Sequence, residues 1–131
     1  KQRGLANLHF VSEVTNEEKR TIMRAAYGFV FPSHMPSEAF GIVLVEAAQQ
    51  GTPMITCEIG TGTSYVNLAG QTGLVVPPSD SVRFGQALDT FWQQPGQVMQ
   101  WGRNALARYE QHFKAETMAQ SYMVAYRDLL S

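Results

Sequence analysis

Two glutamates and a Phe-Gly pair stand out in the segment from residue 32 to residue 46. Glu38 precedes Phe40-Gly41, and Glu46 follows Glu38 by eight positions. Carboxylates accept hydrogen bonds in pairs and suit the vicinal hydroxyls of a sugar or a ribose. A carboxylate beside an anomeric carbon could also stabilise the positive charge of an oxocarbenium-like transition state. If one helix ran from Glu38 to Glu46, a turn of about 100° per residue would place the two carboxylates about 80° apart on one side.

The same spacing has a simpler interpretation. Acidic residues are common near helix starts because they stabilise the helix dipole, so Glu38 could be an ordinary N-terminal charge and Glu46 a solvated helix residue. His34 lies in the same loop and could touch a ligand, although a solvent-exposed loop histidine explains it equally well. Spacing alone leaves these alternatives open.

The second part of this segment predicts an anion site. A helix is expected over residues 42–50, with Gly51 as its C-terminal stop and Pro53 just beyond. A helix N-terminus presents unpaired N–H groups and a partial positive charge, which favour an anion such as a diphosphate. Gly41 would let the backbone come close to that ligand.

The elements that must position these residues alternate between strands and helices. Thr15 and Glu18 form a capping-box pattern at the start of the first helix, and Thr63 or Ser64 could cap a short one ending near residue 68. Such βαβ units require a parallel sheet covered on both faces, so we predict a doubly wound, Rossmann-like α/β fold. Ligands of such sheets bind outside the carboxyl ends of the strands. Strands are predicted over 8–11, 28–31, 53–57 and 73–76, and longer helices over 16–26, 42–50, 82–92, 97–112 and 115–130.

Composition narrows the class of protein. The 131 residues suit one domain at most, and 44% hydrophobic with 16% charged residues is typical of a chain with a packed core. The net charge of −1, with dispersed basic residues, argues against a nucleic-acid surface. The lone Cys57 excludes an internal disulfide, and we expect no metal and no cofactor because no Asp-x-Asp pair or His/Cys ligand spacing is present. Apolar runs are too short for a membrane helix.

The run FVFPSHMPSEAFGIVLVEAAQQGTPMIT resembles the donor-site signature of the retaining glycosyltransferases of the two-domain GT-B fold, family 4 (group 1). That signature is E-x7-E around a central Phe-Gly, and Glu38, Phe40, Gly41 and Glu46 match it. The flanking runs LHFVSEVTNEEKRTIMRAAYGFVFPS and GQTGLVVPPSD are similar to the family in order and spacing. The resemblance implies that residues 1–131 are part of a C-terminal nucleotide-sugar-binding domain, with C-terminal helices over about 97–130.

The resemblance also implies roles for single residues. The carboxylate at Glu38 would be catalytic, contacting the donor sugar near the reacting carbon, and Glu46 would hold the ribose hydroxyls of the nucleotide. Backbone amides at three successive positions would face the sugar and the β-phosphate, and two further positions border the nucleotide base in some members. These are Phe40, Gly41 and Ile42 for the amides, and Val14 and Lys19 for the base. Lys19 is otherwise an ordinary surface lysine.

Two departures from the family pattern accompany the match. Many relatives carry Gly-Gly-x-x-Glu after the third strand, whereas residues 60–67 contain no acid, which indicates a subfamily. The first strand of the family's donor domain, with the Arg and Lys that neutralise the diphosphate, has no counterpart here, nor does the N-terminal acceptor-binding domain. With only four strands predicted and no Met at position 1, we expect further N-terminal strands and that domain to lie outside this chain.

The resulting hypothesis is a hexosyltransferase that uses a nucleotide diphosphate sugar, acts with retention, and has a glycan or lipid-linked acceptor. Its expected location is the cytoplasm, including the inner face of the membrane as a peripheral protein, and its acceptor could be a surface-antigen polysaccharide. A nucleotide-sugar epimerase of GT-B architecture and a non-catalytic binding module are the alternatives, with a structural interaction domain least favoured. The apolar stripe of the last helix predicts core or interdomain packing, and the resemblance implies that this helix crosses towards the other domain, in which case part of the stripe would be exposed in this chain. The stripe comprises Met118, Tyr122, Ala125, Tyr126 and Leu129.

Overall fold

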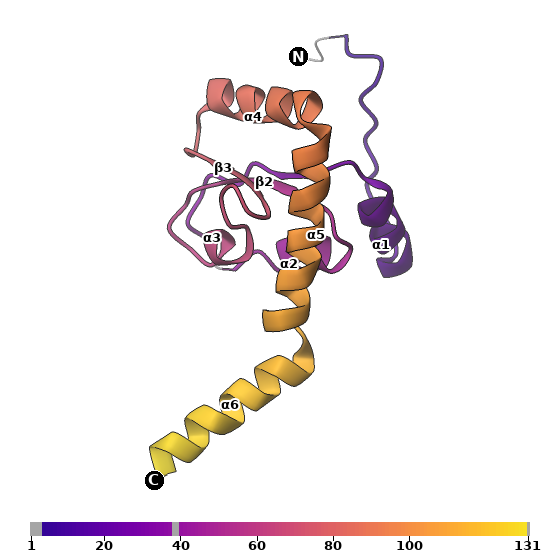
Figure 1. Cartoon of the computed structure of the whole chain (residues 1–131). Helices are drawn as coiled ribbons and strands as arrows, with labels where there is room; N and C mark the ends of the chain where they lie inside the picture. The colour runs from indigo at the N-terminus through magenta and orange to yellow at the C-terminus, as the bar shows by residue number, and fades with distance from the viewer. Residues whose placement is uncertain (1–3, 38–39, 131) are drawn as a thin grey trace.

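The computed structural model describes residues 4–37 and 40–130. Its sheet has three parallel strands in the order β1-β2-β3, namely Phe29–Phe31, Met54–Cys57 and Gly73–Val76. Helices connect and surround these strands (Figure 1). They are α1 (Asn16–Ala25), α2 (Ile42–Gln49), α3 (Thr63–Val66), α4 (Ser81–Gln93), α5 (Pro95–His112) and α6 (Ala115–Leu130).

The central strand β2 is buried along its whole length because helices cover both faces of the sheet. Successive side chains of a strand point to opposite faces. Met54 accordingly belongs to one hydrophobic cluster, with residues of α2, α3 and α5, and Ile55 belongs to a second one, with residues of α4 and the first half of α5. This two-sided covering confirms the predicted doubly wound α/β class.

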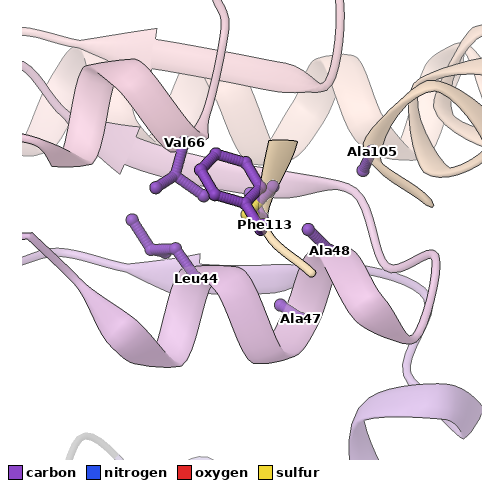
Figure 2. Packing of buried hydrophobic residues seen from close by; sticks show 7 residues of the cluster. Leu44, Ala47, Ala48, Val66, Ala105 and Phe113 are labelled. Atoms are coloured by element: carbon purple, nitrogen blue, oxygen red, sulfur yellow. The ribbon is translucent and has the colours of Figure 1, made fainter. Parts of the chain in front are cut away.

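The first cluster fixes α2, the helix that follows the Phe-Gly pair. Leu44, Ala47 and Ala48 put three fully buried side chains of α2 against the core. Figure 2 shows Leu44 and Ala48 directed toward Val66 of α3 and toward Phe113, which caps the C-terminus of α5. Small residues at two of the three α2 positions let α5 approach closely. The position of α2 is thus determined by packing with segments 20 to 70 residues away in sequence.

The prediction of a strand at residues 8–11 is wrong. The structure gives this segment no strand pairing within the described chain, and Phe10 is 81% exposed. A short apolar run indicates burial but does not specify what covers it, and a strand forms only where a neighbour pairs its backbone N–H and C=O groups. The described sheet therefore has three strands rather than the four predicted.

The helix that carries Glu46 begins at Ile42, as predicted, and Gly41 is its N-cap in the left-handed conformation (φ 72°, ψ 59°). Glu38 lies outside the described residues, and the 80° geometry that assumed one helix through both glutamates does not apply. The short helix α3 begins after Gly62 with no side-chain cap, and the proposed cap Thr63 is a buried residue inside it.

The last helix extends away from the rest of the chain (Figure 1). None of its described residues is buried, and the predicted exposure of the Met118, Tyr122 and Tyr126 stripe is confirmed. Throughout the described residues, each helix is too short or too polar to cross a lipid bilayer.

Candidate functional site

Two predicted site residues that are 27 positions apart meet in the structure. The Lys19 ammonium donates a hydrogen bond to Oε1 of Glu46, with an N–O distance of 2.7 Å. Both side chains are about one-third exposed, at 32% and 33%. A partly exposed pair of this kind contributes at most about 1 kcal/mol to stability. The ion pair therefore orients the Glu46 carboxylate and contributes little to the stability of the fold.

Local structure places Lys19 at the start of α1. The Thr15 hydroxyl accepts from the Glu18 N–H at 3.2 Å, and the Glu18 carboxylate accepts from the Thr15 N–H at 2.7 Å. This confirms the predicted capping box. The Lys19 N–H then donates to the Thr15 carbonyl at 2.9 Å, the first hydrogen bond of the helix. Hydrogen bonding by Thr15 to the Glu18 carboxylate lowers the pKa of Glu18, and the Thr15 backbone N–H is a larger cause than the Thr15 side chain.

Polar contacts also hold the rest of α1 against α2 and the turn after it. The Thr52 hydroxyl donates to the Met23 carbonyl at 2.7 Å, in a buried position. The Arg24 side chain donates from Nε to the Gln50 amide oxygen at 3.2 Å. The docking of α1 thus depends on contacts at its C-terminal end that are independent of Lys19.

Gly41 brings the start of α2 close to the core. A Cβ at this position would lie 2.9 Å from Leu44 Cδ1 and 3.2 Å from Thr63 Cγ2. The Gly41 carbonyl accepts from the Leu44 N–H at 2.8 Å, which closes the first turn. Ile42, the first helical residue, is 71% exposed, so the N-terminus of α2 opens to solvent after the carboxyl end of β1. This is the edge of a parallel sheet where ligands bind.

Phe40 contacts a part of the chain that sequence reasoning did not connect with it. Its ring packs edge-on against Phe113 with 6.4 Å between centroids, and Tyr65 approaches the same ring at 5.8 Å. The Arg108 guanidinium lies 4.8 Å from the centre of the Tyr65 ring and donates from Nε to the Tyr65 carbonyl at 3.1 Å. The Phe-Gly loop is therefore tied to the junction of α5 and α6. No local pattern in the sequence signals such a contact.

Glu58, an acid at the carboxyl end of β2, was not singled out from the sequence. Its Oε1 accepts from the Ser64 hydroxyl at 2.7 Å and from the Gly60 N–H at 3.0 Å. These bonds, the first being the larger cause, hold the pKa of Glu58 below its ordinary value. The carboxylate thus organises the loop of residues 58–64. Its position directly after a buried strand could have indicated a site residue, because ligands bind at the carboxyl ends of parallel strands.

His34 lies apart from the Lys19–Glu46 pair. It lines a cavity of about 420 Å³ on the α4 side of the sheet, together with Cys57 and Phe84. Cys57 is a free, buried thiol in the second hydrophobic cluster, and burial raises its pKa. Val14 lines a different hollow, of about 590 Å³, beside the first turn of α1. Within residues 4–37 and 40–130, no three His, Cys, Asp or Glu side chains form a metal-binding group.

Comparison with known proteins identifies similar chains. Residues 1–108 match the profile of the family described as "Glycosyl transferases group 1". The chain is 54% identical over 112 residues to D-rhamnosyltransferase WbpZ of Pseudomonas aeruginosa, an alignment that covers 86% of this chain and 29% of the relative. It is 41% identical over 129 residues to O-antigen chain mannosyltransferase C of Escherichia coli, covering 98% and 35%. The chain thus spans about a third of these curated relatives.

Solved structures show the same fold. Sucrose-phosphate synthase from Thermosynechococcus elongatus superposes with a TM-score of 0.82 at 30% identity, over 93% of this chain and 30% of that one. HepE of Anabaena, solved in complex with UDP-glucose, superposes with a TM-score of 0.73 at 24% identity, over 82% and 29%. The first of these matches includes most of the C-terminal helical region as well as the sheet.

Proposed function

Because the chain belongs to the group 1 glycosyl transferases, we propose that it supplies the donor site of a retaining, family 4 hexosyltransferase. The donor is a nucleotide diphosphate sugar, bound at the carboxyl edge of the parallel sheet where α1 and α2 begin. The observation that carries the proposal is the Lys19–Glu46 pair beside the exposed N-terminus of α2. It combines a carboxylate suited to a diol with a helix end suited to a diphosphate.

Each chemical requirement of the donor has a candidate group in this arrangement. The backbone around Phe40, Gly41 and Ile42 faces the sugar and the β-phosphate, where the positive end of α2 stabilises the departing diphosphate. Glu46 accepts hydrogen bonds from the ribose hydroxyls. Glu38 acts at the sugar, stabilising positive charge at the anomeric carbon as its bond to the phosphate oxygen breaks.

The nature of the acceptor is proposed from the relatives. WbpZ is named a D-rhamnosyltransferase and the E. coli relative an O-antigen chain mannosyltransferase, and both alignments include the unusual 60–67 loop. We therefore propose that the whole protein transfers a hexose or deoxyhexose to a glycan or lipid-linked acceptor of a surface polysaccharide. Its N-terminal domain would bind that acceptor. The protein would work in the cytoplasm or at the inner face of the membrane.

The direct test is donor turnover by the full-length protein with and without acceptor. A transferase consumes nucleotide sugar only when acceptor is present, whereas an epimerase consumes it alone. We expect acceptor-dependent turnover that survives EDTA, and no transfer by residues 1–131 alone. Turnover without acceptor, or transfer by residues 1–131 alone, would contradict the proposal.

A paired substitution tests the site itself. Glu46→Gln should raise the donor KM about tenfold or more, because a charge-assisted bond to a hydroxyl is lost. Glu110→Gln is the matched control, since Glu110 forms the ion pair with Lys114 at the α5–α6 junction. An equal effect of both changes would mean that Glu46 has no specific role in donor binding.

A further inference from the structure

The ion pair between Lys19 and Glu46 fixes the orientation of the Glu46 carboxylate. The ammonium lies 2.7 Å from Oε1 of Glu46, at the short end of charge-assisted hydrogen bonds. The bond crosses from the first turn of α1 to the second turn of α2. It therefore orients the Glu46 side chain, which would otherwise sample several rotamers at a partly exposed position.

The pair leaves the carboxylate able to bind a diol. An ionised carboxylate has two oxygens and about four lone-pair sites, so one bond at Oε1 uses only part of its capacity. The ammonium has three donors and no acceptor, and cannot replace the carboxylate as a partner for ribose hydroxyls that donate. Within this pair, Glu46 can therefore accept hydrogen bonds from the ribose hydroxyls, whereas Lys19 can only donate.

Charge gives the pair a second effect. A diphosphate donor is negative, and an uncompensated carboxylate at one-third exposure would repel it as it approached the N-terminus of α2. Lys19 supplies the compensating charge before any ligand arrives. Glu46 can then bind the ribose hydroxyls without weakening the electrostatic attraction between the N-terminus of α2 and the phosphates.

We propose that Lys19 is a positioning residue: it holds and neutralises the Glu46 carboxylate, and it acts on donor binding through Glu46 rather than through the nucleotide base. This inference rests on the proposed function, because it takes Glu46 to be a ribose ligand. It changes the role that the family resemblance implies for Lys19, from a group bordering the base to a partner of the carboxylate.

The docking of α1 offers a way to separate this role from a structural one. Arg24 also joins α1 to α2, through the 3.2 Å bond to Gln50, but at the far ends of both helices. Arg24→Met removes a tether between the same two helices and leaves Glu46 untouched. It is therefore the matched control for a general loosening of α1.

The experiment is a double-mutant cycle on the donor KM and kcat of the full-length enzyme, with Lys19→Met, Glu46→Gln and both together. We expect Lys19→Met to raise the donor KM about five- to tenfold with kcat changed less than about twofold. The double variant should match Glu46→Gln alone, because Lys19 then has no carboxylate to position. Lys19→Arg should restore most of the affinity, and Arg24→Met should leave the donor KM unchanged.

Three results would overturn the inference. If the two single effects multiply in the double variant, Lys19 contacts the donor independently, and the inference fails while the proposed function stands. If Arg24→Met raises the donor KM as much as Lys19→Met does, the increase comes from looser docking of α1 on α2 and not from the Lys19–Glu46 bond. If Glu46→Gln leaves the donor KM unchanged, Glu46 is no ribose ligand, and the proposed role of this site fails with the inference.

Discussion

Gly41 packs against the core and also lies at the start of α2, where the donor site is proposed. The substitution Gly41→Ala therefore tests both stability and donor binding. The Gly41 φ of 72° is in the left-handed region, where a residue with a Cβ is disfavoured by about 1–2 kcal/mol. The added Cβ would also lie 2.9 Å from Leu44 Cδ1, and Leu44 is fully buried. Repacking such a side chain costs about 1–3 kcal/mol. We therefore expect Gly41→Ala to lower the free energy of unfolding by about 2–5 kcal/mol.

Gly70→Ala isolates the backbone part of that effect. Gly70 has the same φ of 72°, but a Cβ there would have no atom within 4 Å. Only the conformational cost applies, so the expected loss is about 1–2 kcal/mol. The difference between the two variants measures the contact with Leu44 and Thr63 alone.

Urea unfolding followed by circular dichroism is the assay, with midpoint and slope compared for the native protein and both variants. An equal loss of stability in Gly41→Ala and Gly70→Ala would refute the packing argument. No loss in either variant would refute the strain argument as well. For the site, Gly41→Ala should raise the donor KM more than Gly70→Ala does, because only Gly41 lies at the start of α2.

Three further predictions concern other parts of the chain. Phe113→Ala should lower the free energy of unfolding by about 3–5 kcal/mol in urea titrations, because Phe113 is 8% exposed and packs in the first core cluster; a loss below about 1 kcal/mol would contradict that packing. The pKa of Glu58 is lower in the folded protein than its ordinary value of 4.5, so its ionised carboxylate stabilises the fold at pH values above 4.5. This stabilisation is lost as the pH falls through the folded-state pKa. Ser64→Ala should therefore flatten the pH dependence of unfolding in that range, and an unchanged profile would argue against the bond. Cys57 should react slowly with a thiol reagent in the native protein and rapidly in denaturant, whereas equal rates would mean that its burial is not maintained.

The sequence predicts most of the local structure correctly, because local signals decide it. The capping box at Thr15 and Glu18 starts α1 where predicted, and Gly51 follows the end of α2. The apolar segments of β1, β2 and β3 are each confirmed within two residues of their predicted bounds. In each case the hydrogen bonds or side-chain periodicity responsible lie within a few residues of one another, so they can be read from a single stretch of chain.

The candidate site could be predicted only in part. The residue types of the Phe-Gly segment, and the helix that follows it, are visible in the sequence together with the chemistry they favour. Which of them meet is not visible, because Lys19 and Glu46 are brought together by the packing of α1 against α2 and the turn after it. The contact of Phe40 with Phe113 likewise depends on α5 crossing the sheet to reach the Phe-Gly loop.

The sequence alone determined the fold class, the order of its elements and the residue types available for binding a sugar nucleotide, because short-range hydrogen bonding and periodic burial encode them. The tertiary structure decided three further things. It left residues 8–11 without a strand partner among the described residues, it brought Phe40 against Phe113, and it paired Lys19 with Glu46. Each depends on groups far apart in the chain, and only the packing of the whole sheet and its helices brings such groups into contact.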